Sequence, residues 1–286
     1  MEIPEDSEKI HEDSETENTS KNSFPLLDIA WKKDKLVEPI PNLVILHQYR
    51  RAYLCPNFST ACLKIETFLR IHNIKYVIYD KYKWKGLDRS VPSIFINSDT
   101  ELIPKDAIGL LTDKFALDIN PGLSNNEIAV SNAFQVMIEE QLIPCLELDR
   151  YCYKDWNDYT MLIPPLVPNY MKFMNYYRWK GIGRKVLKRY QAHGIGFVPP
   201  ERLQPLALGN IEAISLLLGE KKFIFGDNVT YLDIVVFAVM SQFYFVTPSS
   251  NPIRKDIVKY SNLQEHHFQV KTLAFPDWNE ICVNDF

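Results

Sequence analysis

An apolar run, a helical pattern and a second apolar run follow one another within residues 43–79, and this order constrains the fold more than any other feature. The runs at 43–48 (LVILHQ) and 76–79 (YVIY) have the composition of buried strands. Between them, apolar residues spaced for one helical face predict a helix over about 57–73. Two strands joined by one helix form a βαβ unit with parallel strands and a right-handed crossover. The chain therefore begins its globular part with an α/β fold.

Two further short strands and a helix follow this unit. The segment 91–97 (VPSIFIN) predicts a strand opened by a proline, and 101–103 predicts a short partner strand. Pro104 then suits the first position of a helix over about 104–115. A βαβ unit followed by two strands and a helix is the element order of a thioredoxin-like domain.

The rest of the chain reads as helical. Breakers at 118–122 (DINPG) separate it from the first part. Capping boxes, in which a cap residue and an acidic residue three positions later bond reciprocally, predict two helix starts at Ser124 and Thr230. A basic and aromatic helix over about 170–191 is expected to break or bend at Gly181 and Gly183. We predict an acidic, disordered tail and linker at 1–40, a thioredoxin-like domain at 41–117 and an all-helical domain at 118–286.

Composition excludes several classes of protein. The chain is 46% hydrophobic and 24% charged with a net charge of −4, so no basic surplus points to nucleic acid. The N-terminus lacks the basic start and apolar run of a signal peptide. The most apolar segment, 234–246, is shorter than the ~20 residues of a membrane span. Five cysteines without a repeated framework or zinc spacing predict a reduced, cytoplasmic protein without a structural metal.

A candidate thiol-handling site lies at the start of the first helix. Asn57 or Ser59 can cap that helix, and Ser59 and Cys62 both fall near its N-terminus, where the helix dipole stabilises a thiolate. Simpler interpretations stand beside this one: Ser59 serves only as a cap, and Cys62 packs inward. Lys64 and Glu66 are expected on the solvated face of the helix.

The same stretch carries a family resemblance. Residues 59–70 (STACLKIETFLR) resemble the SPFCLKLETYLR element of the failed axon connections family, which is related to the metaxins and to nematode cadmium-responsive proteins. The motifs at 193–196 (HGIG), 218–224 (LGEKKFI) and 275–278 (FPDW) also match that family, so the likeness covers about residues 31–278. It implies the architecture of glutathione transferases, a thioredoxin-like domain followed by a helical domain.

The resemblance also implies roles for individual residues. Ser59 falls where glutathione transferases place the side chain that contacts the glutathione sulfur, with Cys62 as second choice. Val91-Pro92 resembles the cis-proline turn whose backbone pairs with the peptide part of glutathione, although only ~5% of X–Pro bonds are cis. Lys105 and Asp106 occupy the place where many glutathione transferases hold the γ-glutamyl group with an acidic residue followed by Ser. Glutathione is thus the expected co-substrate.

Two functions remain open at this point. One is a glutathione transferase-like protein that binds glutathione or a similar thiol, with weak conjugating activity in detoxification or stress response. The other is a non-catalytic interaction or adaptor protein, which could associate with an organelle such as the mitochondrial outer surface through a partner. A homodimer is possible for either function. The serine-bearing helix and the Val91-Pro92 turn favour the first, and the acidic tail and Lys105-Asp106 favour the second.

Overall fold

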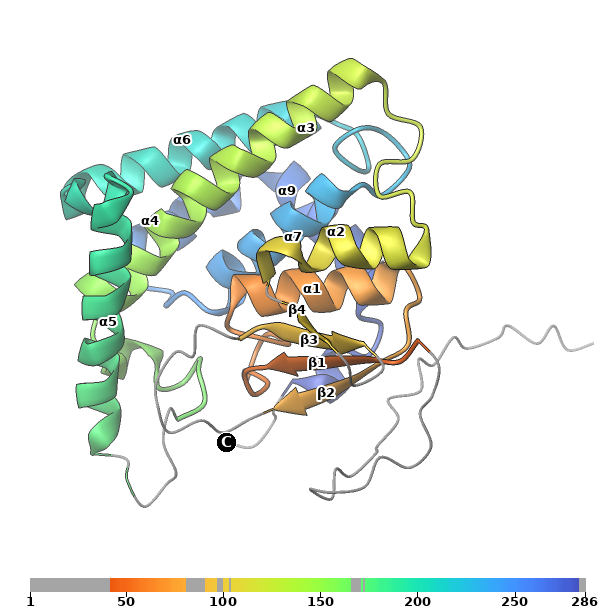
Figure 1. Ribbon diagram of the computed structural model, residues 1–286. Coiled ribbons are helices and arrows are strands. Elements are labelled where there is room, and N and C mark those ends of the chain that lie inside the picture. The colour runs from red at the N-terminus through yellow and green to blue at the C-terminus, as the bar shows by residue number, and fades with distance from the viewer. Residues whose placement is uncertain are drawn as a thin grey trace, which may run out of the picture.

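The structure is a computed structural model that describes residues 42–80, 91–96, 100–102, 104–165, 171 and 173–282. The tail predicted at 1–40 and the last residue of the strand predicted at 101–103 lie outside these residues. A small α/β part is followed in sequence by a helical part, which confirms the predicted fold class (Figure 1). The exact boundary expected near residue 118 stays a prediction. No helix within the described segments is long and apolar enough to cross a membrane.

One four-stranded sheet forms the centre of the α/β part. Its strands are β1 (Val44–Gln48), β2 (Tyr76–Asp80), β3 (Ser93–Ile96) and β4 (Thr100–Leu102), in the spatial order β2-β1-β3-β4. β1 pairs with β2 in parallel and with β3 antiparallel, and Leu46 lies opposite both Ile78 and Ile94. The parallel pair confirms the βαβ unit, with α1 (Thr60–Ile71) as its connection.

Helix α1 and helix α2 (Pro104–Phe115) cover the same face of this sheet (Figure 1). Val44 and Leu46 of β1 are fully buried there against apolar residues of α1 such as Phe68 and of α2 such as Leu111. Pro104 occupies the first position of α2, as expected, because that position needs no amide donor. The packing fixes the start of α1 at one end of the sheet.

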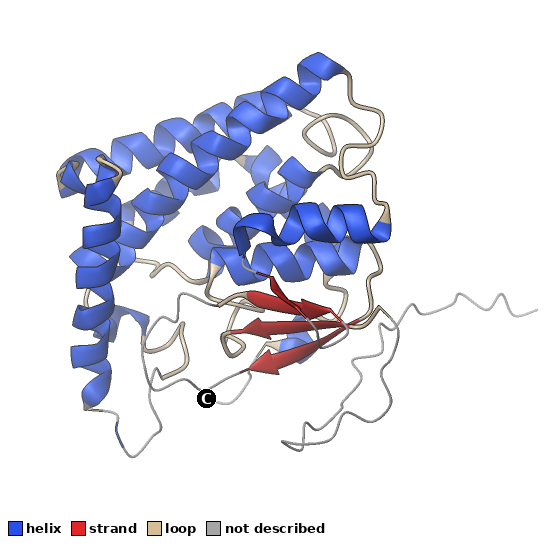
Figure 2. Cartoon of the chain, in the orientation of Figure 1, coloured by secondary structure: helices blue, strands red, loops and turns tan. Residues whose placement is uncertain are grey.

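Helices make up the second part, as the secondary-structure colouring shows (Figure 2). A long first helix runs through α3 (Asn125–Met137), η1 (Ile138–Leu142), α4 (Ile143–Leu148) and η2 (Asp149–Tyr153), where η1 and η2 are π-helical. The shorter helical segments are η3 (Trp156–Tyr159), η5 (Ile195–Phe197), α8 (Pro252–Asp256), η6 (Ile257–Lys259) and α10 (Trp278–Ile281). The longer ones are α5 (Met174–Ala192), α6 (Pro200–Leu218), α7 (Tyr231–Phe245) and α9 (Ser261–Ala274). The capping boxes predicted at Ser124 and Thr230 are both present.

Helix α7 joins the two parts. It packs against α1 on one side and α9 on another, and its residues from Tyr231 to Phe243 are all buried. Asp233 in its first turn accepts hydrogen bonds from the backbone N–H groups of Thr230 and Ile224, both at 2.8 Å, and pairs with His266. A helix that is apolar all round is stable only inside a core, and here that core spans both parts of the chain.

Two expectations from the sequence, a break in α5 and a solvated Glu66, were wrong. Helix α5 runs through Gly181 and Gly183 without a break. A Cβ atom at Gly183 would lie 2.2 Å from the carbonyl oxygen of Tyr151, so this glycine lets α5 pack directly on the backbone of η2. Glu66 does not face solvent: it is fully buried and forms an ion pair with Arg51 at 2.6 Å.

Candidate functional site

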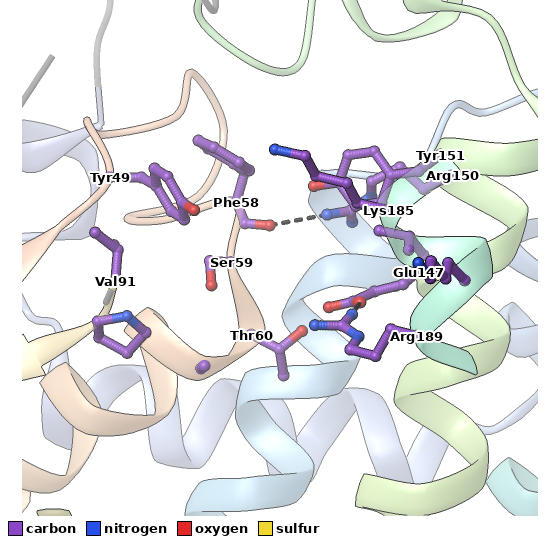
Figure 3. A pocket seen from close by; sticks show the side chains of 14 residues that line it. Tyr49, Phe58, Ser59, Thr60, Val91, Glu147, Arg150, Tyr151, Lys185 and Arg189 are labelled. Carbon is purple, nitrogen blue, oxygen red and sulfur yellow. Dashed lines mark hydrogen bonds and ion pairs between the residues drawn. The ribbon is translucent and has the colours of Figure 1, made fainter. Parts of the chain in front are cut away.

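A pocket of about 600 Å³ lies between the α/β part and the helical part (Figure 3). One wall, here called the α1 wall, consists of Tyr49, residues 58–61 and the Val91-Pro92 pair. The other, here called the basic wall, is formed by Glu147, Arg150, Tyr151, Lys185, Val186, Lys188 and Arg189. The α1 wall thus brings together Ser59 and the Val91-Pro92 turn, which the sequence resemblance had linked.

Ser59 is the N-cap of α1. Its backbone is extended (φ −101°, ψ 122°), and its Oγ accepts a hydrogen bond from the backbone N–H of Cys62 at 3.4 Å. Asn57, the other candidate cap, instead holds the approach to the helix, since its side chain accepts from the Ser59 N–H at 3.0 Å and donates to the Tyr49 carbonyl at 2.9 Å. The Ser59 hydroxyl therefore lies at the positive end of the α1 dipole and on the pocket surface.

Cys62 occupies a different environment. It is fully buried and is not one of the residues that line the pocket. Burial raises the pKa of its thiol to about 12, although hydrogen bonds from Ser59 and from the Tyr49 backbone act in the opposite direction. A thiol with that pKa is protonated near neutral pH, so Ser59 is the better candidate for contact with a ligand sulfur.

The Val91-Pro92 peptide bond is cis, as the resemblance implied. Pro92 is buried, and both residues line the pocket immediately before β3. In the close view, Val91 and Ser59 lie on the same side of the pocket and face the residues of the basic wall (Figure 3). The turn therefore forms the α1 wall together with Ser59.

Lys105 and Asp106 are the second and third residues of α2. Their side chains lie outside the described part of the structure. Their contact with a γ-glutamyl group therefore stays a prediction.

The basic wall was not predicted from the sequence as part of the site. Arg150 in η2 is buried and donates hydrogen bonds to the Phe58 carbonyl at 2.8 Å and to the Gln242 side-chain oxygen at 3.2 Å. Gln242 in α7 in turn donates to the Asn57 carbonyl at 3.0 Å. The helical part thereby holds the loop that delivers Ser59. π-Helical segments such as η2 often occur at functional sites.

Three further cations come from one face of α5. Lys185, Lys188 and Arg189 are spaced i, i+3 and i+4, so they lie together on the helix surface. Arg189 forms an ion pair with Glu147, which also accepts a hydrogen bond from the Tyr190 hydroxyl at 2.8 Å. The spacing of these cations was the one signal in the sequence that could have pointed to the wall.

Metal chemistry has no support in the part of the chain that is described. No three or more of its His, Cys, Asp and Glu side chains are grouped so that they could hold a metal ion. The adjacent His266 and His267 are buried and bond separately, to Asp233 and to Ser241, each at 2.8 Å.

Comparison with known proteins agrees with the fold. The family model described as "Glutathione S-transferase N-terminal domain" matches residues 60–156, and that described as "Glutathione S-transferase, C-terminal domain" matches residues 207–269. "Failed axon connections" of Drosophila melanogaster is 32% identical, with 84% of this chain and 60% of that protein covered. The chain thus spans about 60% of this relative's length.

Solved structures show the same fold at low sequence identity. A glutathione transferase of Phanerochaete chrysosporium matches with a TM-score of 0.56 and 14% identity, covering 83% of this chain and 99% of that one. A glutathione S-transferase of Ceriporiopsis subvermispora, determined in complex with glutathione, matches with a TM-score of 0.54 and 13% identity, covering 81% of this chain and 96% of that one.

Proposed function

Because the chain belongs to the glutathione transferase-fold family, we propose that it binds reduced glutathione, or a similar thiol, in the pocket between the α1 wall and the basic wall. One observation carries the proposal: Ser59, at the N-terminus of α1, lines the same pocket as the cis Val91-Pro92 turn. The glutathione complex of the Ceriporiopsis subvermispora protein supports the choice of ligand. The sulfur would lie at Ser59, and the peptide part would pair with the backbone beside Pro92.

The proposed role of Ser59 is to stabilise a thiolate. A serine hydroxyl that accepts one amide hydrogen bond keeps its own O–H to donate to the sulfur. That donor and the helix dipole both favour the charged form, so the pKa of the bound thiol falls below its ordinary value of about 8.5. The thiolate can then form a bond to an electrophilic carbon, whose leaving group departs with its electron pair. We propose a weak conjugating activity of this kind, with detoxification or stress response as its context.

A second candidate is a non-catalytic adaptor. Lys105 and Asp106 replace the acidic residue and Ser that many glutathione transferases carry at the start of this helix. A protein that binds its thiol weakly for this reason could act through partners instead of turnover. For either candidate we propose a cytoplasmic location, with the mitochondrial outer surface reached through a partner as the alternative, and a homodimer as the assembly to test.

Calorimetry with millimolar reduced glutathione tests the binding. We expect a saturable heat with the folded protein. Ser59→Gly should lower the conjugation rate with chlorodinitrobenzene roughly 10- to 100-fold, because a hydrogen bond to a charged group contributes ~1.5–3 kcal/mol. Glycine is chosen since it costs a helix cap only a few tenths of a kcal/mol, so the fold should be retained.

The control is Cys62→Ala, which should leave the rate unchanged. A folded wild-type protein that gives no heat would reject glutathione binding. A rate abolished by Cys62→Ala but not by Ser59→Gly would show that the sulfur site was assigned to the wrong residue.

A further inference from the structure

We propose that the basic wall binds the anionic group of a second, organic ligand next to the sulfur site, so that the co-substrates of this protein are apolar molecules carrying a carboxylate, sulfonate or phosphate. Its description as a co-substrate site rests on the proposed function. The anion site itself rests on the charges and burial of the wall.

Arg150 is a buried cation without an ion-pair partner among the described residues. It is 2% exposed, and no carboxylate of the described residues lies within ion-pair distance of its guanidinium group. Its Nε atom is buried and has no hydrogen-bond partner among these residues. The Tyr151 and Tyr159 rings lie 5.9 and 5.8 Å from the guanidinium carbon, at the outer limit of a cation–π contact. Burial of an unpaired charge is costly, and an anionic ligand would remove that cost.

The two carboxylates closest in sequence are already engaged. Asp149 accepts a hydrogen bond from the side chain of Asn251 at 2.7 Å. Glu147 is occupied by Arg189 and Tyr190. Glu147 is therefore not available to neutralise Arg150, and Asp149 acts on the Arg150 charge through space without forming an ion pair with it.

The rest of the wall adds to the positive charge. Lys185 and Lys188 are exposed on α5 and form no ion pair with any described carboxylate. Among the described residues that line the pocket, four cations stand against one carboxylate, although the whole chain is net negative. A concave surface of one sign concentrates counter-ions from solution.

The opposite wall selects for an apolar body. No residue of the α1 wall is charged, and the Tyr49 and Phe58 rings lie 4.9 Å apart. A pocket of about 600 Å³ falls within the range of small-molecule sites. An aryl or alkyl anion would place its body along these rings and its charge against Arg150 and the lysines.

Fluorescence titration of the full chain tests this inference. The probe is anilinonaphthalene sulfonate, and the matched neutral probe is N-phenylnaphthylamine, which lacks the sulfonate. We expect Lys185→Gln combined with Lys188→Gln to lower the affinity for the sulfonate dye about tenfold and to leave the affinity for the neutral dye unchanged. Arg150→Gln should lower the affinity for the sulfonate dye roughly a hundredfold or more, provided circular dichroism shows that this variant folds.

The matched control combines Lys114→Gln with Lys255→Gln, two exposed lysines that lie outside the pocket lining. It removes the same charge and should leave both affinities unchanged. The proposal is overturned if this control loses as much affinity for the sulfonate dye as the Lys185/Lys188 variant does, or if the Lys185/Lys188 variant loses none. Displacement of the dye by inorganic phosphate as readily as by phenylbutyrate would also overturn it, since the site would then suit a free anion.

Calorimetry with glutathione separates this proposal from the function it extends. Retained glutathione binding without charge-dependent dye binding rejects the anion site alone. Charge-dependent dye binding in a protein that gives no glutathione heat rejects the proposed function and the co-substrate role, and leaves the anion site.

Discussion

Two buried arginines of this molecule differ in how their charge is balanced. Arg70 in α1 is 1% exposed and pairs with Asp277 at 2.6 Å and with Glu66 at 3.4 Å. It also donates to the Ala274 carbonyl at 3.2 Å, so it ties the C-terminal segment to α1. Arg150 is 2% exposed and donates to a backbone carbonyl and a neutral amide.

The difference separates a structural role from a binding role. Glu66 receives hydrogen bonds from Arg51, Gln48 and Tyr76 in addition to its pair with Arg70, so the charge and the acceptor oxygens of this carboxylate are satisfied within the protein. Such a network stabilises the fold and needs no bound ligand to compensate its charges. Within the described part of the chain, no carboxylate lies at ion-pair distance from Arg150, which lines a pocket. The free-energy cost of a buried arginine charge can be offset either by a carboxylate within the fold or by an anion bound from solution.

The largest expected effect is on the balanced network. Glu66→Gln should lower the free energy of unfolding by roughly 3–5 kcal/mol, because removal of one partner leaves a buried cation uncompensated. Urea denaturation followed by circular dichroism measures the loss.

The control for this substitution is Glu139→Gln. Glu139 pairs with Lys64 at 2.7 Å, but both side chains are partly exposed, so the expected loss is at most about 1 kcal/mol. Equal losses at the two positions would mean that burial does not distinguish these ion pairs, and the contrast between the two arginines would lose its basis.

The same network predicts a dependence of stability on acid pH. Burial acts to raise the pKa of the Glu66 carboxyl, but the charge and hydrogen bonds of Arg51 outweigh it and hold that pKa below its ordinary value. The unfolded chain therefore takes up this proton at a higher pH, near 4.3, than the folded chain does. The stabilisation is complete above that range and is lost as pH falls through the folded pKa. Thermal unfolding of wild type and Glu66→Gln from neutral to acid pH should show two curves that converge, and parallel curves would contradict the assignment.

Local signals in the sequence were sufficient for the fold and for the helix cap at Ser59. The βαβ pattern, the capping boxes and the residues around Ser59 depend on neighbours within a few positions, and these predictions agree with the structure. Glu66 and Arg150 depend on contacts far along the chain: Arg150 bonds residue 58, which is 92 positions away. The pattern of α1 could not reveal the burial of Glu66, because Arg51 and Gln48, which bond it together with Arg70 of the same helix, lie outside α1. Charge balance in a core is a tertiary property, and Arg150 was missed for that reason, whereas the spacing of the α5 cations was a local signal.

The smallest predicted effect concerns the contact that supports the basic wall. Gly183→Ala should lower the free energy of unfolding by roughly 1–3 kcal/mol, because the added Cβ would lie 2.2 Å from the Tyr151 carbonyl oxygen and force α5 away from η2. Arg150 lies in the same turn of η2, so affinity for the sulfonate dye should fall as well. Gly181→Ala is the matched control: its Cβ meets no atom within 4 Å, and replacing a mid-helix glycine should add about 0.5–1 kcal/mol of stability. A gain at both positions would mean that the close contact of α5 with η2 does not position Arg150.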